Sequence, residues 1–263
     1  MDNTLAIIPI FAPRWREYTE EEEIVSQASR VLLATGLTGA IGQAVVELIH
    51  PSWHIIGIRR SPVNVKEPVE WVQADLRDPV QMAEKVQTAL HQLNVRHIAG
   101  VVHLAGVVYS DIATNSTSSE WEQMMNVNLR SAFELVKIAK PLLCSSASIV
   151  FVSSVDALMA SALGPAAVYG ASKAGLEGLM RHLAAEWGED GIRVNTVMVG
   201  ALFEGMGVAD SEESESIREN ISLGRLGRAR EIAPAIRFLL EDEQSSYITG
   251  HTLRVDGGLN LRY

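Results

Sequence analysis

Residues 31–42 read Val-Leu-Leu-Ala-Thr-Gly-Leu-Thr-Gly-Ala-Ile-Gly, an apolar run that passes directly into a loop rich in glycine. Apolar residues then recur at helical spacing over residues 44–49, so we expect a strand, a tight turn and a helix in immediate succession. Gly36 permits the sharp turn, and Gly42 permits close packing of the helix on the strand. This order is typical of the first unit of a parallel sheet.

The small residues of this loop predict a site for the phosphates of a dinucleotide. Gly39 and Ala40 leave room for backbone N–H groups to approach a pyrophosphate, and the N-terminus of the following helix adds unpaired N–H groups. A glycine-rich turn is often only a turn, so this alternative stays open here. The predicted cofactor-binding residues of the loop are Thr35, Gly36, Thr38, Gly39, Ala40, Ile41 and Gly42.

From residue 30 onward, short runs of β-branched apolar residues alternate with longer helical patterns. Such alternation predicts an α/β fold in which crossover helices cover a doubly wound parallel sheet of about seven strands. No repeat or linker-like stretch divides the sequence, so residues 30–263 are expected to form one dinucleotide-binding catalytic domain. The candidate strands are Val31–Ala34, His54–Ile58, Glu70–Val72, Ile98–Leu104, Ser148–Val152, Arg193–Met198 and Thr252–Val255.

Residues 1–29 stand outside this alternation and are expected to form an N-terminal extension. Thr19 and Glu22 have the spacing of a capping box, which predicts a short helix over about 20–29. The apolar stretch Leu5–Phe11 is expected to be an arm. It docks either on its own domain or on another subunit, and the residues favour neither alternative.

The composition argues against several classes of function. Twenty-two Lys and Arg against thirty-two Asp and Glu give a net charge of −10, which disfavours nucleic acid and anionic membrane as partners. Leu5–Ala12 is also too short to span a bilayer. The single Cys144 cannot form an internal disulfide, which fits a cytoplasmic location. The seven histidines include no HExxH pattern, so no metal site is expected.

A second group of residues is suited to acid–base chemistry. Tyr169 and Lys173 lie four residues apart in a helical pattern, which places a phenol and an ammonium on one face. The charge of Lys173, together with the positive nicotinamide ring of a bound cofactor, is expected to stabilise the phenolate and so lower the pKa of Tyr169 from its ordinary value of about 10 toward neutrality. Ser154 ends the preceding strand, where it can orient a substrate carbonyl. The alternative is an incidental surface pair of Tyr169 and Lys173.

Taken together, these motifs resemble the short-chain dehydrogenase/reductase family over residues 30–258, with Ala40 in place of the middle glycine of the family's Thr-Gly-x-x-x-Gly-x-Gly loop. The resemblance implies a Rossmann-like sheet and a catalytic set of Asn128, Ser154, Tyr169 and Lys173. In the family, the residue matching Asn128 bends its helix and holds a water that relays protons to the lysine. The implied cofactor contacts beyond the loop are Asp75, Leu76, Ala105, Gly106, Tyr169, Lys173, Gly200 and Leu202.

Three departures from the family pattern concern the site. His103 replaces an asparagine and is expected to be a packed core residue. Val199 replaces the proline before Gly200, and Glu204 stands where a threonine commonly contacts the carboxamide of the cofactor. The last two bear on the nicotinamide end of the site.

The end of the second candidate strand predicts the choice of cofactor. A dinucleotide fold that prefers NAD carries an acid about 20 residues beyond the glycine loop, where it binds the ribose hydroxyls. Arg59 and Arg60 occupy this region instead, and a guanidinium can pair with a 2′-phosphate. We therefore expect NADP(H) rather than NAD(H), with one of the two arginines facing the ribose.

These residues predict an NADP(H)-dependent oxidoreductase that interconverts a ketone and a secondary alcohol, with Tyr169 as the acid/base. A 3-oxoacyl-thioester reductase acting on an acyl carrier is the alternative within the family. A redox-silent dinucleotide-binding or scaffold protein is the alternative from another class, although a binding module has no use for Tyr169 and Lys173 together.

The expected pocket walls are residues 107–110, 156–163 and 201–222, and their side chains predict a largely apolar carbonyl or alcohol substrate. Acids in and near the site would repel an acidic acyl carrier protein, so a free small molecule is favoured. The wall residues behind the substrate prediction are Leu158, Met159, Leu202, Phe203 and Met206, with Asp156 and Glu204. The acids are Glu186, Glu189 and Asp190, and, in the expected lid, Asp210, Glu212, Glu213 and Glu215.

Assembly is predicted from the two long helices, about 120–140 and 169–187. Members of the family that the chain resembles are usually dimers or tetramers built on these two helices, and the apolar residues here exceed what one sheet face needs, so we expect a homo-oligomer, a tetramer first and otherwise a dimer. The residues on which this prediction depends are Leu135, Leu176, Leu179 and Met180.

Overall fold

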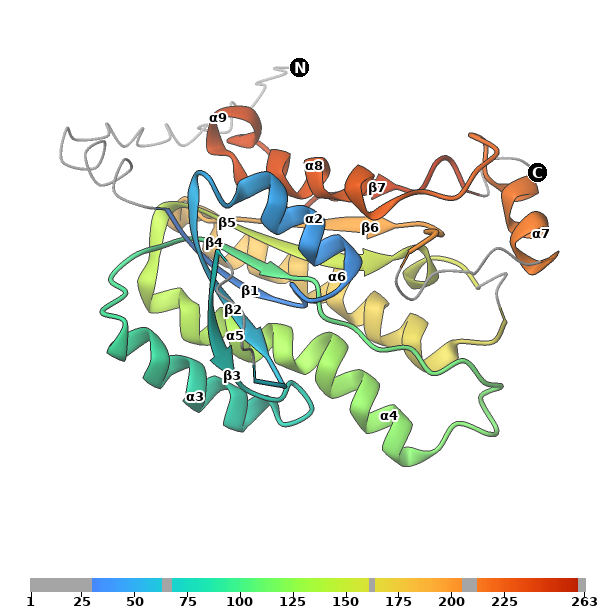
Figure 1. The fold of residues 1–263 in the computed structure, drawn as a ribbon, viewed down its shortest axis with the longest axis horizontal. Coiled ribbons are helices and arrows are strands. Elements are labelled where there is room, and N and C mark those ends of the chain that lie inside the picture. The colour runs from blue at the N-terminus through green and yellow to red at the C-terminus, as the bar shows by residue number, and fades with distance from the viewer. Residues whose placement is uncertain (1–29, 63–67, 161–163, 205–211, 260–263) are drawn as a thin grey trace, which may run out of the picture.

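A parallel sheet of seven strands runs through the centre of the protein, with strand order β3-β2-β1-β4-β5-β6-β7 (Figure 1). The computed structural model describes residues 30–62, 68–160, 164–204 and 212–259; the expected arm and helix within residues 1–29 lie outside this range. The strands are β1 Arg30–Thr35, β2 Trp53–Arg59, β3 Val69–Gln73, β4 Ile98–His103, β5 Leu143–Ser154, β6 Arg193–Val199 and β7 Thr252–Val255. The predicted Rossmann-like fold with seven strands is therefore confirmed, although β5 begins five residues before the predicted Ser148.

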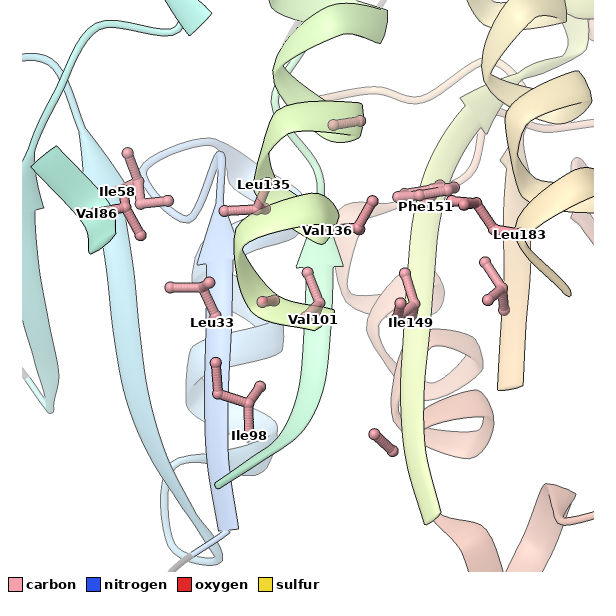
Figure 2. Close-up of a cluster of buried hydrophobic side chains, with 14 of the residues drawn as sticks. Leu33, Ile58, Val86, Ile98, Val101, Leu135, Val136, Ile149, Phe151 and Leu183 are labelled. Atoms are coloured by element: carbon pink, nitrogen blue, oxygen red, sulfur yellow. The ribbon is translucent and has the colours of Figure 1, made fainter. Parts of the chain in front are cut away.

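Helices cover both faces of the sheet (Figure 1). The core between β1, β4 and β5 and one helical layer includes Leu33, Val101, Leu135, Phe151 and Leu183 (Figure 2). A second core on the opposite face is built with α2 and α8. The helices are α2 Ala40–Ile49, α3 Pro79–Gln92, α4 Ser118–Met125, α5 Ser131–Ala139, α6 Ala167–Trp187, α7 Glu212–Asn220, α8 Ala229–Leu240 and α9 Asp242–Ser245.

The turn between β1 and α2 has room for glycine only. Gly36 has φ +73°, and a Cβ there would lie 2.5 Å from the backbone nitrogen of Ala105. A Cβ at Gly42 would lie 2.4 Å from the carbonyl oxygen of Gly36. Since β1 lies between β2 and β4, this turn places the N-terminus of α2 at the point where strand order reverses, which is where open α/β sheets bind ligands.

The predicted helix over about 120–140 is interrupted. A π-helical turn, Asn126–Arg130, separates α4 from α5 and contains the buried Asn128. Such turns widen the helix locally and change which backbone groups are paired, and they are frequent at functional sites. The bend that the family resemblance implies at Asn128 takes this form.

The apolar side chains that were expected to form a subunit interface are buried inside the protomer. Leu135, Leu176 and Met180 are buried in its own core, and Leu179 is partly buried against the same core. This reason for an oligomer was therefore wrong, because the side chains that seemed surplus from sequence all face the sheet or its neighbouring helices.

Candidate active site

A cavity of about 750 Å³ opens along the carboxyl ends of the strands and runs from the glycine loop to Tyr169. It is large enough for a dinucleotide together with a small substrate. Every predicted cofactor-binding residue except Thr35 lines it: Gly36, Thr38, Gly39, Ala40, Ile41, Gly42, Arg59, Arg60, Asp75, Leu76, Ala105, Gly106, Tyr169, Lys173, Gly200 and Leu202.

Thr35 lies behind the cavity wall. Its side chain is fully buried, and its hydroxyl is 2.8 Å from His103 Nδ1 and accepts a hydrogen bond from the Ala105 N–H at 3.4 Å. The structure therefore places Thr35 as a support for Ala105 at the end of β4, and the cavity-lining part of the loop begins at Gly36.

The chain offers a fitted cradle for the phosphates of a dinucleotide. Gly36 and Gly42 leave space that a Cβ would fill, and Gly39 stands at the N-cap of α2 without a side chain over the helix end. Free N–H groups at a helix N-terminus and the positive end of its dipole attract phosphate. Ala40, the departure from the glycine pattern, lines the same cradle.

The adenosine end of the cavity gathers three arginines. The guanidinium of Arg59 stacks over the Trp71 ring, 5.1 Å from its centroid, whereas Arg60 is exposed. Arg77 is a residue that the sequence analysis missed; its Nη2 donates to Asp75 Oδ2 at 2.7 Å, and its Nε also reaches Asp75 Oδ1 at 3.2 Å. The pairing with Arg77 lowers the pKa of Asp75, so this carboxylate stays charged.

The predicted acid–base residues meet at the other end of the cavity. Tyr169 and Lys173 lie one turn apart near the start of α6, with Lys173 Nζ 5.8 Å from the centroid of the Tyr169 ring. Lys173 Nζ donates to the carbonyl of Val152 at 2.8 Å, which ties α6 to β5. Ser154 ends β5, and its hydroxyl is hydrogen-bonded to Tyr169 and to Asp156.

The residues of the chain raise the pKa of Tyr169, so Lys173 by itself does not produce the predicted lowering. Burial raises it to about 12, a hydrogen bond with Ser154 opposes the shift, and the charge of Asp156 adds to it. Burial also lowers the pKa of Lys173 to about 8, against the attraction of Glu177. Desolvation of the phenolate is the largest cause of the shift, and the chain alone holds Tyr169 in its protonated form.

Asn128 lies directly behind this pair. Its Nδ2 donates to the Val107 carbonyl and to Ser172 Oγ, both at 2.9 Å, and its Oδ1 accepts from the Val107 N–H at 2.8 Å. A Cβ added at Gly106 would lie 3.4 Å from Lys173 Nζ and 3.6 Å from Asn128 Oδ1. The missing side chain at Gly106 therefore keeps a small space between the amide and the ammonium.

The substrate end of the cavity is mostly apolar. Val107, Val108, Met159, Ile217 and Leu259 line it, in keeping with the prediction for residues 107–110 and for the start of 156–163. Residues 161–163 and 205–211, including the predicted Met206, lie outside the described residues.

Two predicted wall residues were wrong, and the acids at the end of α6 lie far from the cavity. Leu158 and Phe203 do not line the cavity and are 64% and 44% exposed. Glu186 follows Tyr169 by seventeen residues in the same helix, which puts it roughly 26 Å away. The neighbouring Asp190 pairs with Lys140. The acids at the end of α6 are therefore too far from the cavity to repel a carrier protein docking there.

Several proteins of a known family match this chain over most of its length. The family model described as Enoyl-(Acyl carrier protein) reductase matches residues 59–260. A tropinone reductase homolog of Arabidopsis thaliana is 32% identical over 265 residues, which cover 92% of this chain and 96% of that protein. Another homolog so named is 38% identical over 154 residues, which span only 56% of its length and 57% of this chain. The 3-oxoacyl-[acyl-carrier-protein] reductase FabG of Salmonella typhimurium is 31% identical, covering 90% of this chain and 100% of that one.

The chain belongs to the short-chain dehydrogenase/reductase family. It is thus an oxidoreductase of this family, whose members use a nicotinamide dinucleotide. A blue fluorescent protein from a metagenomic library, solved with NADPH, has a TM-score of 0.79 at 28% identity, covering 90% of this chain and 100% of that one. A 4-hydroxyisoleucine dehydrogenase solved with NADH has a TM-score of 0.79 at 26% identity, covering 89% and 100%. Neighbours of this short-chain dehydrogenase/reductase therefore bind either dinucleotide.

Glu204, the family departure at the nicotinamide end, is engaged by the fold. Its Oε2 accepts from the Ala229 N–H at 3.0 Å, at the first turn of α8, and its Oε1 lies 3.5 Å from Arg228 Nη1. A carboxylate at a helix N-terminus is a favourable cap. Gly200, after the other departure at Val199, is required because a Cβ there would lie 2.7 Å from Asp256 Cα.

Among the described residues, no helix combines the length and the hydropathy that crossing a membrane requires. In the same part of the chain, no group of three or more His, Cys, Asp or Glu side chains is placed to hold a metal ion.

His103 lies beneath the short-chain dehydrogenase/reductase site, where it contacts Thr35 on one side and the π-helical turn with Asn128 on the other. It is fully buried between Thr35 and the π-helical turn, and its Nε2 has no hydrogen-bond partner among the described residues. Burial, followed by the charge of Lys173, lowers its pKa to about 3, while the carbonyls of Val127 and Asn128 oppose this shift. The imidazole is therefore neutral at physiological pH.

This neutral burial predicts a pH-dependent stability. Below the unfolded pKa of about 6.5, the unfolded chain binds a proton at His103 that the folded chain does not bind, so the contribution of His103 to stability is lost as pH falls. Chemical denaturation between pH 7 and pH 5 should show the wild type losing up to about 1.4 kcal/mol per pH unit more than His103→Asn. Parallel stability curves for the two proteins would contradict a buried neutral His103.

Proposed function

We propose that the protein is an NADP(H)-dependent oxidoreductase that interconverts a ketone and a secondary alcohol. The observation that carries the proposal is the meeting of Ser154, Tyr169 and Lys173 at one end of a cavity whose other end is the glycine cradle. A bound nicotinamide supplies or accepts the hydride in this chemistry. A protein that only bound a dinucleotide would need the cradle alone.

Each side chain has a distinct role in the proposal. Ser154 donates a hydrogen bond to the substrate oxygen and fixes its position. Tyr169 gives a proton to that oxygen in reduction and takes it back in oxidation. Lys173 stabilises the phenolate that forms when Tyr169 loses its proton. Asn128, fixed by its hydrogen bonds to Val107 and Ser172, orders the proton relay through which Lys173 and Tyr169 are protonated again.

The electrostatics favour the reductive direction. A phenol with a pKa raised to about 12 carries its proton at neutral pH, which is the state required to protonate a developing alkoxide. Oxidation of an alcohol needs the phenolate and is therefore disfavoured until pH rises. We propose ketone reduction as the direction to which the chain itself contributes most.

A 3-oxoacyl-thioester reductase is the second candidate. Its support is the match to FabG over the whole length of that protein, together with the match of residues 59–260 to the enoyl-(acyl carrier protein) reductase family model. The distance of Glu186 and Asp190 from the cavity removes part of the electrostatic argument against an acyl carrier. A free, largely apolar ketone remains the first choice because apolar side chains such as Val108, Met159 and Leu259 line the substrate end.

Assembly and location complete the proposal. Trp121 on α4 and Phe133 on α5 are 49% and 43% exposed, and such large apolar side chains on the outer helices support a homo-oligomer, a tetramer or a dimer. The free Cys144 and the absence of other cysteines from the sequence fit a reducing cytoplasm.

Tyr169→Phe tests the proposed reaction. With NADPH and a panel of ketones, the variant should lose about 100-fold or more in kcat because it lacks the proton donor, while NADPH binding is retained. Tyr247→Phe, at a fully exposed tyrosine, is the matched control and should keep the wild-type rate. Faster wild-type reduction of a 3-oxoacyl carrier thioester than of any free ketone would favour the second candidate. NADPH binding without turnover of either substrate class would favour a redox-silent protein.

Arg60→Ala tests the choice of cofactor. Because Arg59 is engaged with Trp71 while Arg60 is exposed at the cavity, we expect Arg60 to be the arginine that meets the 2′-phosphate. Loss of one charge-assisted hydrogen bond should weaken NADPH binding about tenfold or more and leave NADH binding little changed. Arg59→Ala should have the smaller effect, and the double variant should lose the preference entirely.

Fluorescence titration of both cofactors on the four proteins measures this. A wild type that binds NADH as tightly as NADPH, or an Arg60→Ala protein with unaltered preference, would contradict the assignment to NADP(H).

A further inference from the structure

A carboxylate stands beside the side chain that orients the substrate. Ser154 Oγ donates to Asp156 Oδ2 at 2.7 Å, and the Asp156 N–H donates back to Ser154 Oγ at 3.3 Å. The backbone holds this arrangement in place, since a Cβ at Gly170 would lie 2.8 Å from the Asp156 carbonyl oxygen. The turn Val155–Ala157 is thus packed tightly against the first turn of α6, and the carboxylate has a fixed position in the cavity wall.

The charge of Asp156 has no partner of opposite sign in the described part of the chain. Glu204, the other acid at this end, is occupied by the Ala229 N–H and Arg228. Lys173 directs its ammonium to the Val152 carbonyl. Asp156 therefore presents an uncompensated negative charge to a wall that is mostly apolar.

The position of this charge relative to the reaction follows from the hydrogen bonds. A substrate oxygen bound by Ser154 takes the single hydroxyl hydrogen that Oγ otherwise donates to Asp156 Oδ2, 2.7 Å away, so the substrate oxygen and the carboxylate both lie next to Oγ. A substituent on a carbon next to the carbonyl can therefore reach the carboxylate. A negative substituent there is repelled, and a positive one is attracted in a partly desolvated site.

We propose that Asp156 is a specificity-determining residue that selects substrates carrying a cationic ammonium group one or two carbons from the reacting carbonyl. This rests on the proposed function and names the substrate class of the same site. The apolar wall formed by residues such as Val108 and Met159 accommodates the alkyl groups of such a substrate.

The same pairing assists the catalytic groups. A substrate cation competes with the Ser154 hydroxyl for Asp156, which leaves that hydroxyl free to donate to the carbonyl oxygen. It also offsets the negative charge that Asp156 places near Tyr169, which on its own disfavours the phenolate. A neutral ketone of the same shape provides neither effect.

A pair of isosteric ketones isolates the charge. (2-Oxopropyl)trimethylammonium and 4,4-dimethylpentan-2-one differ in one atom, a quaternary nitrogen in place of a quaternary carbon. With NADPH, the wild type should reduce the cation with a kcat/KM about tenfold or more above that of the neutral ketone. Asp156→Asn keeps the size and a hydrogen-bond acceptor for Ser154 but removes the charge, so it should lower the ratio of the two kcat/KM values about tenfold or more, through a loss on the cation that the neutral ketone does not share.

Asp111→Asn is the matched control, because Asp111 is an exposed acid that does not line the cavity and whose carboxylate is bound by the Ile112 N–H and Asn115. It should keep the wild-type ratio. A wild type without preference for the cation, or an Asp156→Asn protein that loses the same factor on both ketones, would overturn the proposal and leave Asp156 as a purely structural cap.

A binding measurement separates this proposal from the proposed function. The corresponding alcohols, (2-hydroxypropyl)trimethylammonium and 4,4-dimethylpentan-2-ol, cannot react with NADPH, so calorimetry on the NADPH-bound protein reports affinity alone. If no ketone is reduced but the cationic alcohol binds about tenfold or more tightly and only Asp156→Asn abolishes this, the reaction is wrong and the role of Asp156 stands. Equal affinities of the wild type for both alcohols overturn the role of Asp156 whether or not ketones are reduced.

Discussion

The buried ammonium of Lys173 is the group around which the catalytic end is arranged. Taking an ammonium out of water is costly unless polar groups replace its hydration. Here the Val152 carbonyl accepts its hydrogen bond at 2.8 Å, and Glu177, one turn further along α6, favours the charge. The ammonium thereby ties α6 to β5, and Gly106 lets the chain after β4 approach the same point. Tyr169, one turn earlier, is positioned by the same attachment.

The electrostatic balance at this point favours the protonated phenol. Burial dominates the pKa of Tyr169, and Asp156 acts in the same direction, so the chain keeps Tyr169 in the protonated state that the proposed reduction requires. Lys173, with a pKa lowered to about 8, still carries its charge at neutral pH. Proton donation and substrate selection are thus linked, because the acid that holds the proton on Tyr169 is also the acid that we expect to select the substrate.

The sequence was sufficient where local pattern determines structure. All seven strands were predicted, since most contain a short run of apolar, β-branched residues, and the spacing of Tyr169 and Lys173 determined their common face. The glycine turn was predictable because a position at which any side chain would clash with the backbone appears in the sequence as a glycine, here Gly36 and Gly42.

Features that depend on long-range packing could not be predicted in the same way. The ion pair of Arg77 with Asp75 and the capping of α8 by Glu204 depend on loop conformation, which the pattern of apolar residues does not encode. The burial of Leu135 depends on how two helical layers meet the sheet. The sign of the shift at Tyr169 required the degree of burial, since the competing field of Lys173 was visible from spacing and the desolvation was not.

The pH dependence of reduction tests the central claim that Tyr169 is held protonated beside a charged Lys173. With NADPH and a neutral ketone, kcat/KM should stay constant from about pH 6 to about pH 7.5 and fall above about pH 8, where Lys173 loses its proton. Tyr169→Phe should show no residual activity with this profile. A wild-type rate of reduction that instead rises with pH through a pKa near neutrality would place the proton transfer on another group and contradict the account.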